Sequence, residues 1–569
     1  MSAFDRPVPA PPDARERTER WWHRATGYQI YPRSFADSNG DGVGDIPGII
    51  SKLGHLADLG VGFVWLSPVY ASPMVDNGYD IADYRAIAPE YGTLEEMDRL
   101  IAAAAQRDIG IVMDLVVNHS SSRHAWFQAA RKSRETPEHD FYIWRDPAPG
   151  GGPPDDQMAA FGGPAWSWAE DVGQYYFHYF SPAQPDLNWQ NPEVRRAIYD
   201  MMRWWLDRGI AGFRMDVISL IGKDVDARLY EEGPDLHRFL QEMHREVLAD
   251  RDVVTIGESW SVSPKTGLLY CRRDRKELDM VFEFSHIREG WDPEHGKFAP
   301  KPFDLVGFKR ALFDWQYLTR HDGWHALFLS NHDLPRQVSF YADDGVYRRD
   351  AARMLATMLH LLKGTPFIYQ GEEIGMTNAR FERIGQYKDL ETLNHFEQQI
   401  AQGVAPEDFI AGANRNSRDN SRTPMQWSSA PNGGFSSGTP WIEVNPNADE
   451  INVEQDLQHP ESIFAHYRHL IRLRRELDVI VFGETRQLLE TDPAIMAYER
   501  KLGESRVVVL GNFTAQSQAV VLPEEVCGTG QCLVASHRRR DRLGPNTELA
   551  PYESLALWMD RTPPTQAGE

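Results

Sequence analysis

The stretches GIAGFRMD (209–216), DVVTIGE (252–258) and HALFLSNHD (325–333) decide the fold of this chain. Each is apolar like a buried strand and closes on a carboxylate, namely Asp216, Glu258 and Asp333. In a parallel β/α barrel the C-terminal strand ends form one rim, where catalytic groups lie. Cleavage of a glycosidic bond needs a nucleophile and a proton donor around an oxocarbenium-like centre. One acid could merely cap a strand or pair with an arginine, but three at the same point favour this chemistry.

The rest of the sequence supplies enough strands for a closed barrel. Most of the strand-like runs are preceded by apolar residues at helical spacing, as in 46–60 and 94–110. Alternating helices and strands predict a parallel sheet, and eight units allow it to close. The eight runs span 27–35, 61–70, 109–119, 209–218, 252–260, 278–285, 325–333 and 365–375.

Two further units interrupt or follow this alternation. Between the third and fourth runs lies a long stretch rich in aromatic residues, Gly and Pro, which predicts a subdomain over the catalytic rim. After an amphipathic helix that ends near 477, short alternating strands predict an all-β sandwich. We therefore expect an α/β fold, a (β/α)8 TIM barrel with an insertion after strand 3. Its predicted parts are the first barrel segment (1–118), the inserted subdomain (119–184), the remaining barrel (185–479) and the C-terminal β-sandwich (480–569).

The composition limits the possible partners. The formal net charge is −23 over 569 residues, so the chain repels nucleic-acid phosphates. Three cysteines without a pattern favour a reducing compartment. The first 20 residues lack the apolar core of a signal peptide, and no stretch is long enough to cross a membrane. We predict a cytoplasmic monomer or small homo-oligomer that binds a neutral small molecule and neither nucleic acid nor membrane.

Several ordered motifs resemble a known family. The chain is similar to the α-amylase superfamily (glycoside hydrolase family 13), and within it to oligo-1,6-glucosidases and dextran glucosidases, over roughly residues 20–560. Four motifs resemble the superfamily blocks, namely DLVVNHSS, GFRMDVI, GESW and SNHDLPR. Four more resemble this α-glucosidase branch: QPDLNW (184–189), QGEEIGM (370–376), YKDLETLN (387–394) and SRDNSRTPMQW (417–427).

The resemblance implies a role for each carboxylate. Asp216 matches the nucleophile, Glu258 the general acid/base and Asp333 the transition-state stabiliser. Arg214 precedes Asp216 by two residues, so both point to the same side of the strand, and its charge would keep Asp216 ionised. The resemblance also implies that two histidines near strand ends, His119 and His332, bind hydroxyls of the cleaved glucose.

Other positions are expected to shape the pocket. By resemblance, Asp80 in GYDIADY and Arg422 in RDNSRTPMQW close the pocket around the non-reducing glucose, which makes the enzyme exo-acting. A charged pair can bond several hydroxyls at one end of a sugar. Tyr79, Phe161 and Phe180 are candidate stacking residues, with plain packing as the alternative.

The leaving sugar is expected on the other side of the cleaved bond, at the +1 subsite. Val217 follows the nucleophile, and in the resembling enzymes a valine there accompanies α-1,6 bonds. Trp260 resembles the aromatic residue that borders the +1 sugar in dextran glucosidases. GKFAPK (296–301) offers a lysine to the same subsite, either Lys297 or Lys301.

The acidic loop DSNGDGVGD (37–45) is a candidate metal site. Oxygen ligands that alternate with small residues suit Ca²⁺ or Mg²⁺, and a metal loop in the resembling branch has this pattern. The expected ligands are Asp37, Asn39, Asp41, the Val43 carbonyl and Asp45. The loop lies apart from the three carboxylates, so we expect a structural ion, Ca²⁺ or Mg²⁺; an acidic turn without metal is the alternative.

Together these features predict an exo-acting, retaining α-glucosidase that hydrolyses α-1,6 bonds of isomalto-oligosaccharides. Within the same fold the alternatives are an α-1,4-glucosidase (a maltase) and a sucrose or trehalose isomerase with the same triad. A non-catalytic sugar-binding relative is the alternative from another class. Loss of a triad carboxylate would mark such a relative, and all three are present.

Overall fold

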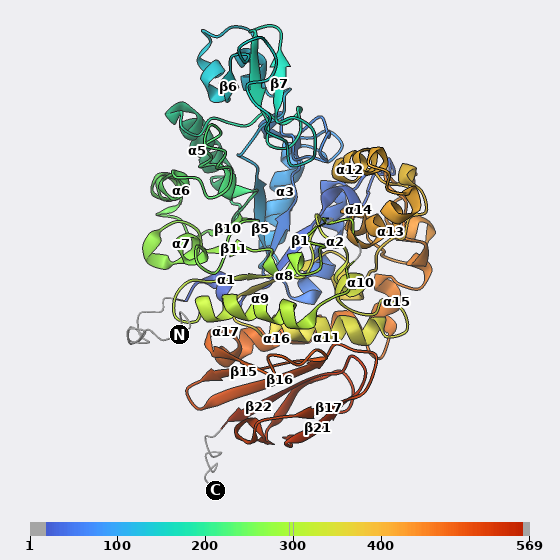
Figure 1. Cartoon of the computed structure of the whole chain (residues 1–569). Coiled ribbons are helices and arrows are strands. Elements are labelled where there is room, and N and C mark those ends of the chain that lie inside the picture. Colours follow the sequence, from blue (N-terminus) through green and yellow to red (C-terminus); the bar gives the residue numbers. More distant parts are fainter. Residues whose placement is uncertain (1–18, 295, 300, 561–569) are drawn as a thin grey trace.

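The computed structural model describes residues 19–294, 296–299 and 301–560. Its centre is an eight-stranded parallel sheet, and each strand falls inside one of the eight predicted runs, so the barrel prediction is confirmed (Figure 1). In sheet order the strands are β11 (Met280–Phe282), β10 (Val254–Glu258), β9 (Gly212–Met215), β5 (Gly110–Leu115), β2 (Phe63–Leu66), β1 (Gly27–Ile30), β13 (Thr365–Tyr369) and β12 (Ala326–Leu327).

Aromatic packing shows that the sheet curls on itself. Trp65 of β2 lies 5.6 Å, centroid to centroid, from Phe282 of β11, although three strands separate β2 from β11 in the sheet order. Phe282 also meets Phe367 of β13 at 4.7 Å. These side chains are at most 2% exposed. The barrel interior is therefore a packed core, and chemistry is left to the strand ends.

Helices surround the barrel because each strand is followed by an amphipathic segment with local start and stop signals. For example, α2 begins where Asp45 accepts a hydrogen bond from the Gly48 amide at 2.6 Å, and it ends at Gly60, whose φ of 92° suits glycine. The outer helices are α2 (Ile46–Leu59), α3 (Leu94–Ala105), α5 (Pro192–Leu206), α6 (Leu236–Met243), α7 (Gly267–Cys271), α9 (Leu305–Leu318), α11 (Arg348–His360) and α16 (Ile463–Glu476).

The inserted segment and the C-terminal segment form sheets of their own. Between β5 and β9 the chain builds the three-stranded sheet β6 (Trp144–Arg145), β8 (Gln174–Phe177) and β7 (Trp166–Ala169), which projects from one end of the barrel in Figure 1. At the opposite end the strands β14 (Glu484–Leu488), β15 (Ile495–Leu502), β16 (Ser505–Asn512), β22 (Ser554–Asp560) and β19 (Gln531–Ala535) form a five-stranded sheet. It shares a core with the pair β17 (Gln518–Val521) and β21 (Asn546–Leu549), which confirms the predicted all-β domain.

A long excursion after β13 was not predicted as helical. It contains α12 (Leu390–Ala401), α13 (Pro406–Asn416) and the single turn α14 (Asp419–Arg422), which lie together in Figure 1. A separate apolar cluster that includes Phe298, Tyr387 and Phe409 holds α12 and α13 in place. This excursion supplies two charged side chains, Glu391 and Arg418, to a cavity at the rim of the barrel, as described below.

The structure bears on one part of the predictions about location and assembly. Within the described ranges, no helix combines the length and apolarity needed to cross a bilayer. The N-terminal residues in which we expect no signal peptide lie mostly outside the described part of the chain. The cytoplasmic location and the oligomeric state stay predictions.

Candidate active site

The three predicted catalytic carboxylates line one cavity at the C-terminal ends of the strands. Asp216 directly follows β9, Glu258 is the last residue of β10, and Asp333 lies in the loop after β12. β9 and β10 are hydrogen-bonded neighbours with Met215 paired to Gly257, so the residues that follow them lie side by side. The structure therefore brings together the three carboxylates that the sequence argument placed at strand ends.

Arg214 is a buried side chain that donates hydrogen bonds to several carboxylates of the site. It is 1% exposed, and its Nη1 donates to Asp216 Oδ1 at 2.8 Å and to Asp114 Oδ1 at 2.8 Å, while its Nη2 donates to Glu258 Oε2. The predicted contact between Arg214 and Asp216 is thus present. The guanidinium is not dedicated to Asp216, however, because three carboxylates share its charge.

The groups around Asp216 shift its pKa in opposing directions. Burial raises the pKa of Asp216 well above the usual aspartate value; the Arg214 charge opposes this rise, and the charges of Glu258 and Asp114 reinforce it. Arg214 therefore favours the ionised form of Asp216, as expected, and it does so against burial and two neighbouring carboxylate charges. Asp333 behaves in the opposite way. Against the effect of burial, His332, Arg418 and Arg422 hold the pKa of Asp333 below its usual range.

Val217 adopts a backbone conformation that is unusual for its type. Its φ of 35° and ψ of 44° lie in the left-handed region, which a β-branched residue rarely occupies. In this conformation its amide donates to Glu258 Oε2 at 3.0 Å. Strained residues persist at functional sites when the surrounding structure holds them there, and here the strain links the residue after Asp216 to the predicted acid/base.

The predicted histidines and Tyr79 form one packed group beside the cavity. The rings of Tyr79 and His332 stack with centroids 5.1 Å apart, and the Tyr79 hydroxyl donates to Asp114 Oδ2 at 3.0 Å. His332 Nε2 lies 3.2 Å from Asp333 Oδ2, and His119 Nε2 lies 3.0 Å from the Tyr79 carbonyl. Burial lowers the pKa of His332 to about 3 and also lowers that of His119. Both rings are therefore neutral near pH 7. Of the two, His119 lines the cavity, with its ring nitrogens already in contact with Asn118 and the Tyr79 carbonyl, whereas His332 is fully buried.

The predicted pair Asp80 and Arg422 does not close the pocket. Asp80 is fully buried and accepts hydrogen bonds from Ser72 Oγ and from the amides of Val75 and Asp76, so it stabilises the loop that precedes it. The carboxylate that this loop presents to the cavity is Asp76, four residues earlier.

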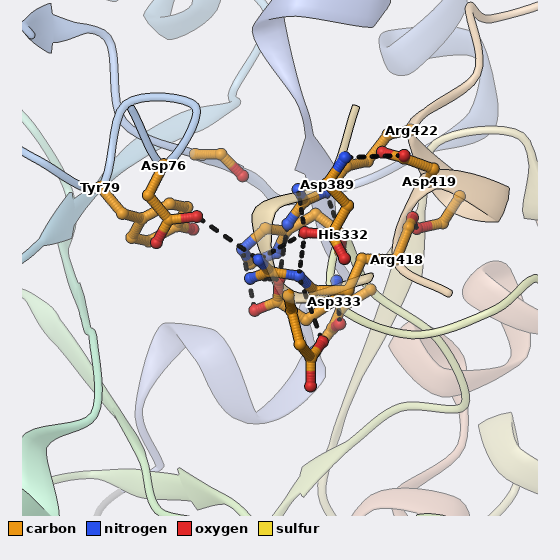
Figure 2. A network of polar contacts seen from close by, with 12 residues as sticks. Asp76, Tyr79, His332, Asp333, Asp389, Arg418, Asp419 and Arg422 are labelled. Carbon is orange, nitrogen blue, oxygen red and sulfur yellow. Dashed lines mark hydrogen bonds and ion pairs between the residues drawn. The ribbon is translucent and has the colours of Figure 1, made fainter. Parts of the chain in front are cut away.

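The charged pair at this end of the cavity is Asp76 with Arg418 (Figure 2). Arg418 Nη2 lies 3.4 Å from Asp76 Oδ1, and its Nη1 lies 3.2 Å from Asp333 Oδ1. Arg422 lies behind Arg418 and donates to Asp333 Oδ1 at 2.8 Å and to the His332 carbonyl at 2.9 Å. The correction is therefore from Asp80 to Asp76 and from Arg422 to Arg418, with Arg422 in a supporting position.

The side expected to receive the leaving sugar is walled by aromatic residues and an ion pair. Trp260 stacks on Phe284 with centroids 3.7 Å apart, and its indole N–H donates to Glu258 Oε1 at 3.1 Å. Trp291 and Lys297 line the same wall, and Lys297 Nζ lies 2.7 Å from Glu391 Oε2. Of the two candidate lysines the structure brings Lys297 to the cavity, whereas Lys301 donates to the Glu289 carbonyl.

The remaining lining residues divide into predicted and missed positions. Phe161 and Phe180, predicted from the sequence, both line the cavity, with ring centroids 5.2 Å apart. Nine described lining residues were missed, and most come from loops or from the excursion after β13: Asp76, Ala160, Tyr179, Ser219, Leu220, Glu231, Trp291, Glu391 and Arg418. Glu391 lies in the motif YKDLETLN and Arg418 in SRDNSRTPMQW. Both motifs were noted for their resemblance to the α-glucosidase branch, but neither of these two residues was predicted to line the site.

The candidate metal loop lies away from this cavity. Asp37 Oδ1 accepts from the Asn39 and Gly40 amides, its Oδ2 accepts from the Gly42 amide, and Asp45 caps α2. Within the described residues no three His, Cys, Asp or Glu side chains gather as a metal would require. A cation here would therefore depend on the Asn39 amide and the Val43 carbonyl as well, and the metal stays a prediction.

The barrel holds a buried arginine that bonds Asp216, Glu258 and Asp114, with Asp333 nearby and aromatic rings along the pocket. This arrangement defines a carboxylate-dependent glycoside hydrolase. The chain matches the α-amylase catalytic domain over residues 29–483 and the α-amylase SusG C-terminal domain over residues 495–555. It belongs to the α-amylase family.

Individual relatives are similar over almost the whole chain. A palatinase from Erwinia rhapontici is 50% identical over 549 residues, which cover 96% of this chain and 100% of the relative. An oligo-1,6-glucosidase from Halalkalibacterium halodurans is 49% identical over 552 residues, 94% of this chain and 98% of the relative. The crystal structure of trehalose-6-phosphate hydrolase from Bacillus licheniformis has a TM-score of 0.91 at 42% identity and covers 95% of this chain and 100% of that one.

Proposed function

We propose that this glycoside hydrolase is an exo-acting, retaining α-glucosidase that releases glucose from the non-reducing end of short α-1,6-linked oligosaccharides. The observation that carries the proposal is the asymmetry of the cavity. The Asp76–Arg418 ion pair crosses one part of the lining, and Trp260 and Trp291 line another part. Glu391, which contacts both Lys297 and Arg418, lies between the two parts. A pocket that such an ion pair closes accepts a chain terminus and excludes an internal segment.

The chemistry follows from the placement of Asp216 and Glu258. The Asp216 carboxylate attacks the anomeric carbon while Glu258 gives its proton to the leaving oxygen, so the glycosidic bond breaks as a glycosyl ester forms. Glu258, now ionised, takes a proton from water; the water attacks the same carbon, and Asp216 leaves as a carboxylate. The shared Arg214 guanidinium keeps both carboxylates close together, which supports the double-displacement reading with retention.

The α-1,6 preference is the finer part of the proposal. It is supported by the similarity to oligo-1,6-glucosidases at about half of all positions and by Val217 beside the nucleophile. The stacked pair Trp260 and Phe284 offers an apolar platform for a sugar ring at the +1 side. An α-1,4-glucosidase or an isomerase would use the same triad and stays the alternative.

The charge of the cavity favours a neutral substrate. Its described lining carries six carboxylates (Asp76, Asp216, Glu231, Glu258, Asp333 and Glu391) and two cations (Lys297 and Arg418). Both cations are already paired with carboxylates. A phosphorylated disaccharide would bring a dianion into this field, and like charges there are repulsive. We therefore propose unphosphorylated oligosaccharides as substrates.

A kinetic comparison tests this function. We expect kcat/KM to be highest for isomaltose or panose, at least tenfold lower for maltose, and low for sucrose and for long dextran. A preference for maltose would overturn the α-1,6 assignment. Conversion of sucrose into another disaccharide faster than its hydrolysis would favour an isomerase. Efficient internal cleavage of dextran would contradict the exo mode.

A further inference from the structure

Asp389 is a fully buried carboxylate next to the cavity that the proposed reaction does not use. It lies at the start of α12, in the excursion after β13, and is 0% exposed. Figure 2 shows it among the arginines on the side of the network away from Asp76. It does not itself line the cavity among the described residues, so any role in turnover must act through its neighbours.

Its first oxygen contacts both arginines of the network. Asp389 Oδ1 accepts from Arg418 Nε at 2.8 Å and lies 2.5 Å from Arg418 Nη2. The same oxygen lies 3.5 Å from Arg422 Nη1. Arg418 in turn reaches Asp76 and Asp333, and Arg422 reaches Asp333. One buried carboxylate thus anchors the two cations that hold both acidic groups at the closed end of the cavity.

Asp389 is itself firmly held. Its second oxygen accepts from the Thr392 amide at 3.1 Å and from the Thr392 hydroxyl at 2.7 Å, which caps α12. Its own amide donates to Asp419 Oδ2 at 2.9 Å. A carboxylate that is held in place can orient the arginines it binds, because the N–H donors of a guanidinium lie in one plane and must match the positions of their acceptors.

The ionisation of the two neighbouring acids supports this arrangement. The charges of Arg418 and Arg422 hold the pKa of Asp389 below its usual range against the effect of burial. Burial and the nearby Asp389 charge raise the pKa of Asp419 to about 6. Asp389 is therefore the ionised partner of the arginines, whereas Asp419 accepts hydrogen bonds from the backbone amides of Lys388 and Asp389.

We propose that Asp389 is a positioning residue for hydrolysis: it orients Arg418 and Arg422 so that Asp333 and Asp76 meet the non-reducing sugar in a productive geometry. The proposal rests on the exo-acting pocket described above. Without Asp389 the two guanidinium groups would keep Asp333 and Asp76 as carboxylate partners, and Arg418 Nε would keep Glu391 Oε2 at 3.5 Å. Both groups would lose the fully buried carboxylate that sets their direction. A displacement of about 1 Å at such groups can lower turnover about a hundredfold.

The test uses the full-length enzyme and p-nitrophenyl α-glucoside, which has no second sugar and is independent of linkage preference. Asp389→Asn keeps the shape and removes the charge, and we expect kcat/KM to fall about 10- to 100-fold, mainly through kcat. Asp389→Glu keeps the charge but moves it, so we expect a smaller loss, also in kcat.

Two further readouts separate positioning from general stability. In a double-mutant cycle Asp389→Asn and Asp76→Asn should be clearly non-additive in kcat/KM, because both act through Arg418; additive losses would indicate a merely structural role. A crystal structure of Asp389→Asn should show Arg418 turned from its position. The proposal is overturned if Asp389→Asn and Asp389→Glu both keep wild-type kcat, or if Arg418 does not move. A wild type inactive on the aryl glucoside would refute the proposed function, while the crystal structure would still judge the positioning role.

Discussion

Replacing Trp260 by phenylalanine tests how the aromatic wall acts on Glu258. The change removes the indole N–H that donates to Glu258 Oε1 at 3.1 Å, while an aromatic ring remains to stack on Phe284. Trp291 is a matched control. It lines the same wall, and its indole nitrogen is buried without a hydrogen-bond partner within the described structure. Trp291→Phe therefore changes ring size without removing a bond to the predicted acid/base.

The expected magnitude follows from the bond that is lost. Glu258 loses its proton in the transition state, so the bond strengthens there. A hydrogen bond to a charged group contributes about 1.5–3 kcal/mol, and each 1.4 kcal/mol corresponds to about tenfold in rate. A distance of 3.1 Å is at the long end for such a bond, so the lower part of this range applies. We expect kcat/KM on isomaltose to fall about 10- to 30-fold in Trp260→Phe, with most of the loss in kcat.

The assay compares kcat and KM of wild type, Trp260→Phe and Trp291→Phe under identical conditions. Trp291→Phe should stay within about threefold of wild type in kcat, because surface and packing changes of this size are worth less than about 1 kcal/mol. Equal losses in the two variants would mean that ring area matters and the Glu258 contact does not. A loss of Trp260→Phe confined to KM would also refute the reasoning.

Three other perturbations have defined outcomes. Asp216→Asn should lower kcat about 10⁴-fold or more, yet raise Tm by about 1–3 °C at pH 7. The pKa of Asp216 is higher in the folded than in the unfolded protein, so the folded state loses stability as pH rises from about 3.8 towards the folded-state pKa. Asparagine does not ionise and therefore avoids this loss. A lower Tm, measured calorimetrically, would contradict the sign. Val217→Ala should shift kcat/KM from isomaltose towards maltose about tens-fold, since methyl-scale changes are worth about 1–3 kcal/mol; an unchanged ratio would make Val217 a packing residue. Chelation should lower Tm and leave the kcat of folded enzyme unchanged if the 37–45 loop binds Ca²⁺ or Mg²⁺; an unchanged melting curve would argue against a metal.

Much of the barrel could be predicted because each strand is buried on both faces. Such strands are near-continuous apolar runs, and their polar ends mark the rim. Asp216 and Glu258 were found in this way, and Arg214 followed from the two-residue period of a strand. These inferences use only local periodicity, which a single sequence displays directly.

The pocket end could not be predicted because it depends on loop closure. Asp76 and Asp80 lie four residues apart in one turn, and only the hydrogen bonds of the folded loop show that Asp80 is internal while Asp76 faces the cavity. Arg418, which precedes α14, and Arg422, the last residue of α14, pose the same problem. A resemblance marks such a motif but does not say which of two like residues reaches the substrate.

Long-range packing hides the remaining features. Asp389 and Arg418 are 29 residues apart in the chain, and α12 and α13 bring them together through a separate apolar cluster. The left-handed conformation of Val217 is invisible in the sequence, since a β-branched residue favours extended backbone. Tertiary contacts produce both the approach of Asp389 to Arg418 and the Val217 conformation, and neither can be predicted from a local sequence pattern.

The most direct test of the account is the anomeric form of the first glucose released from isomaltose, followed by proton NMR in the first seconds to minutes of turnover. Attack by Asp216 followed by attack by water inverts the anomeric carbon twice. The account predicts α-glucose from the non-reducing unit, with β-glucose appearing later at the rate of spontaneous mutarotation. Initial release of β-glucose would contradict Asp216 as the nucleophile and with it the proposed double displacement.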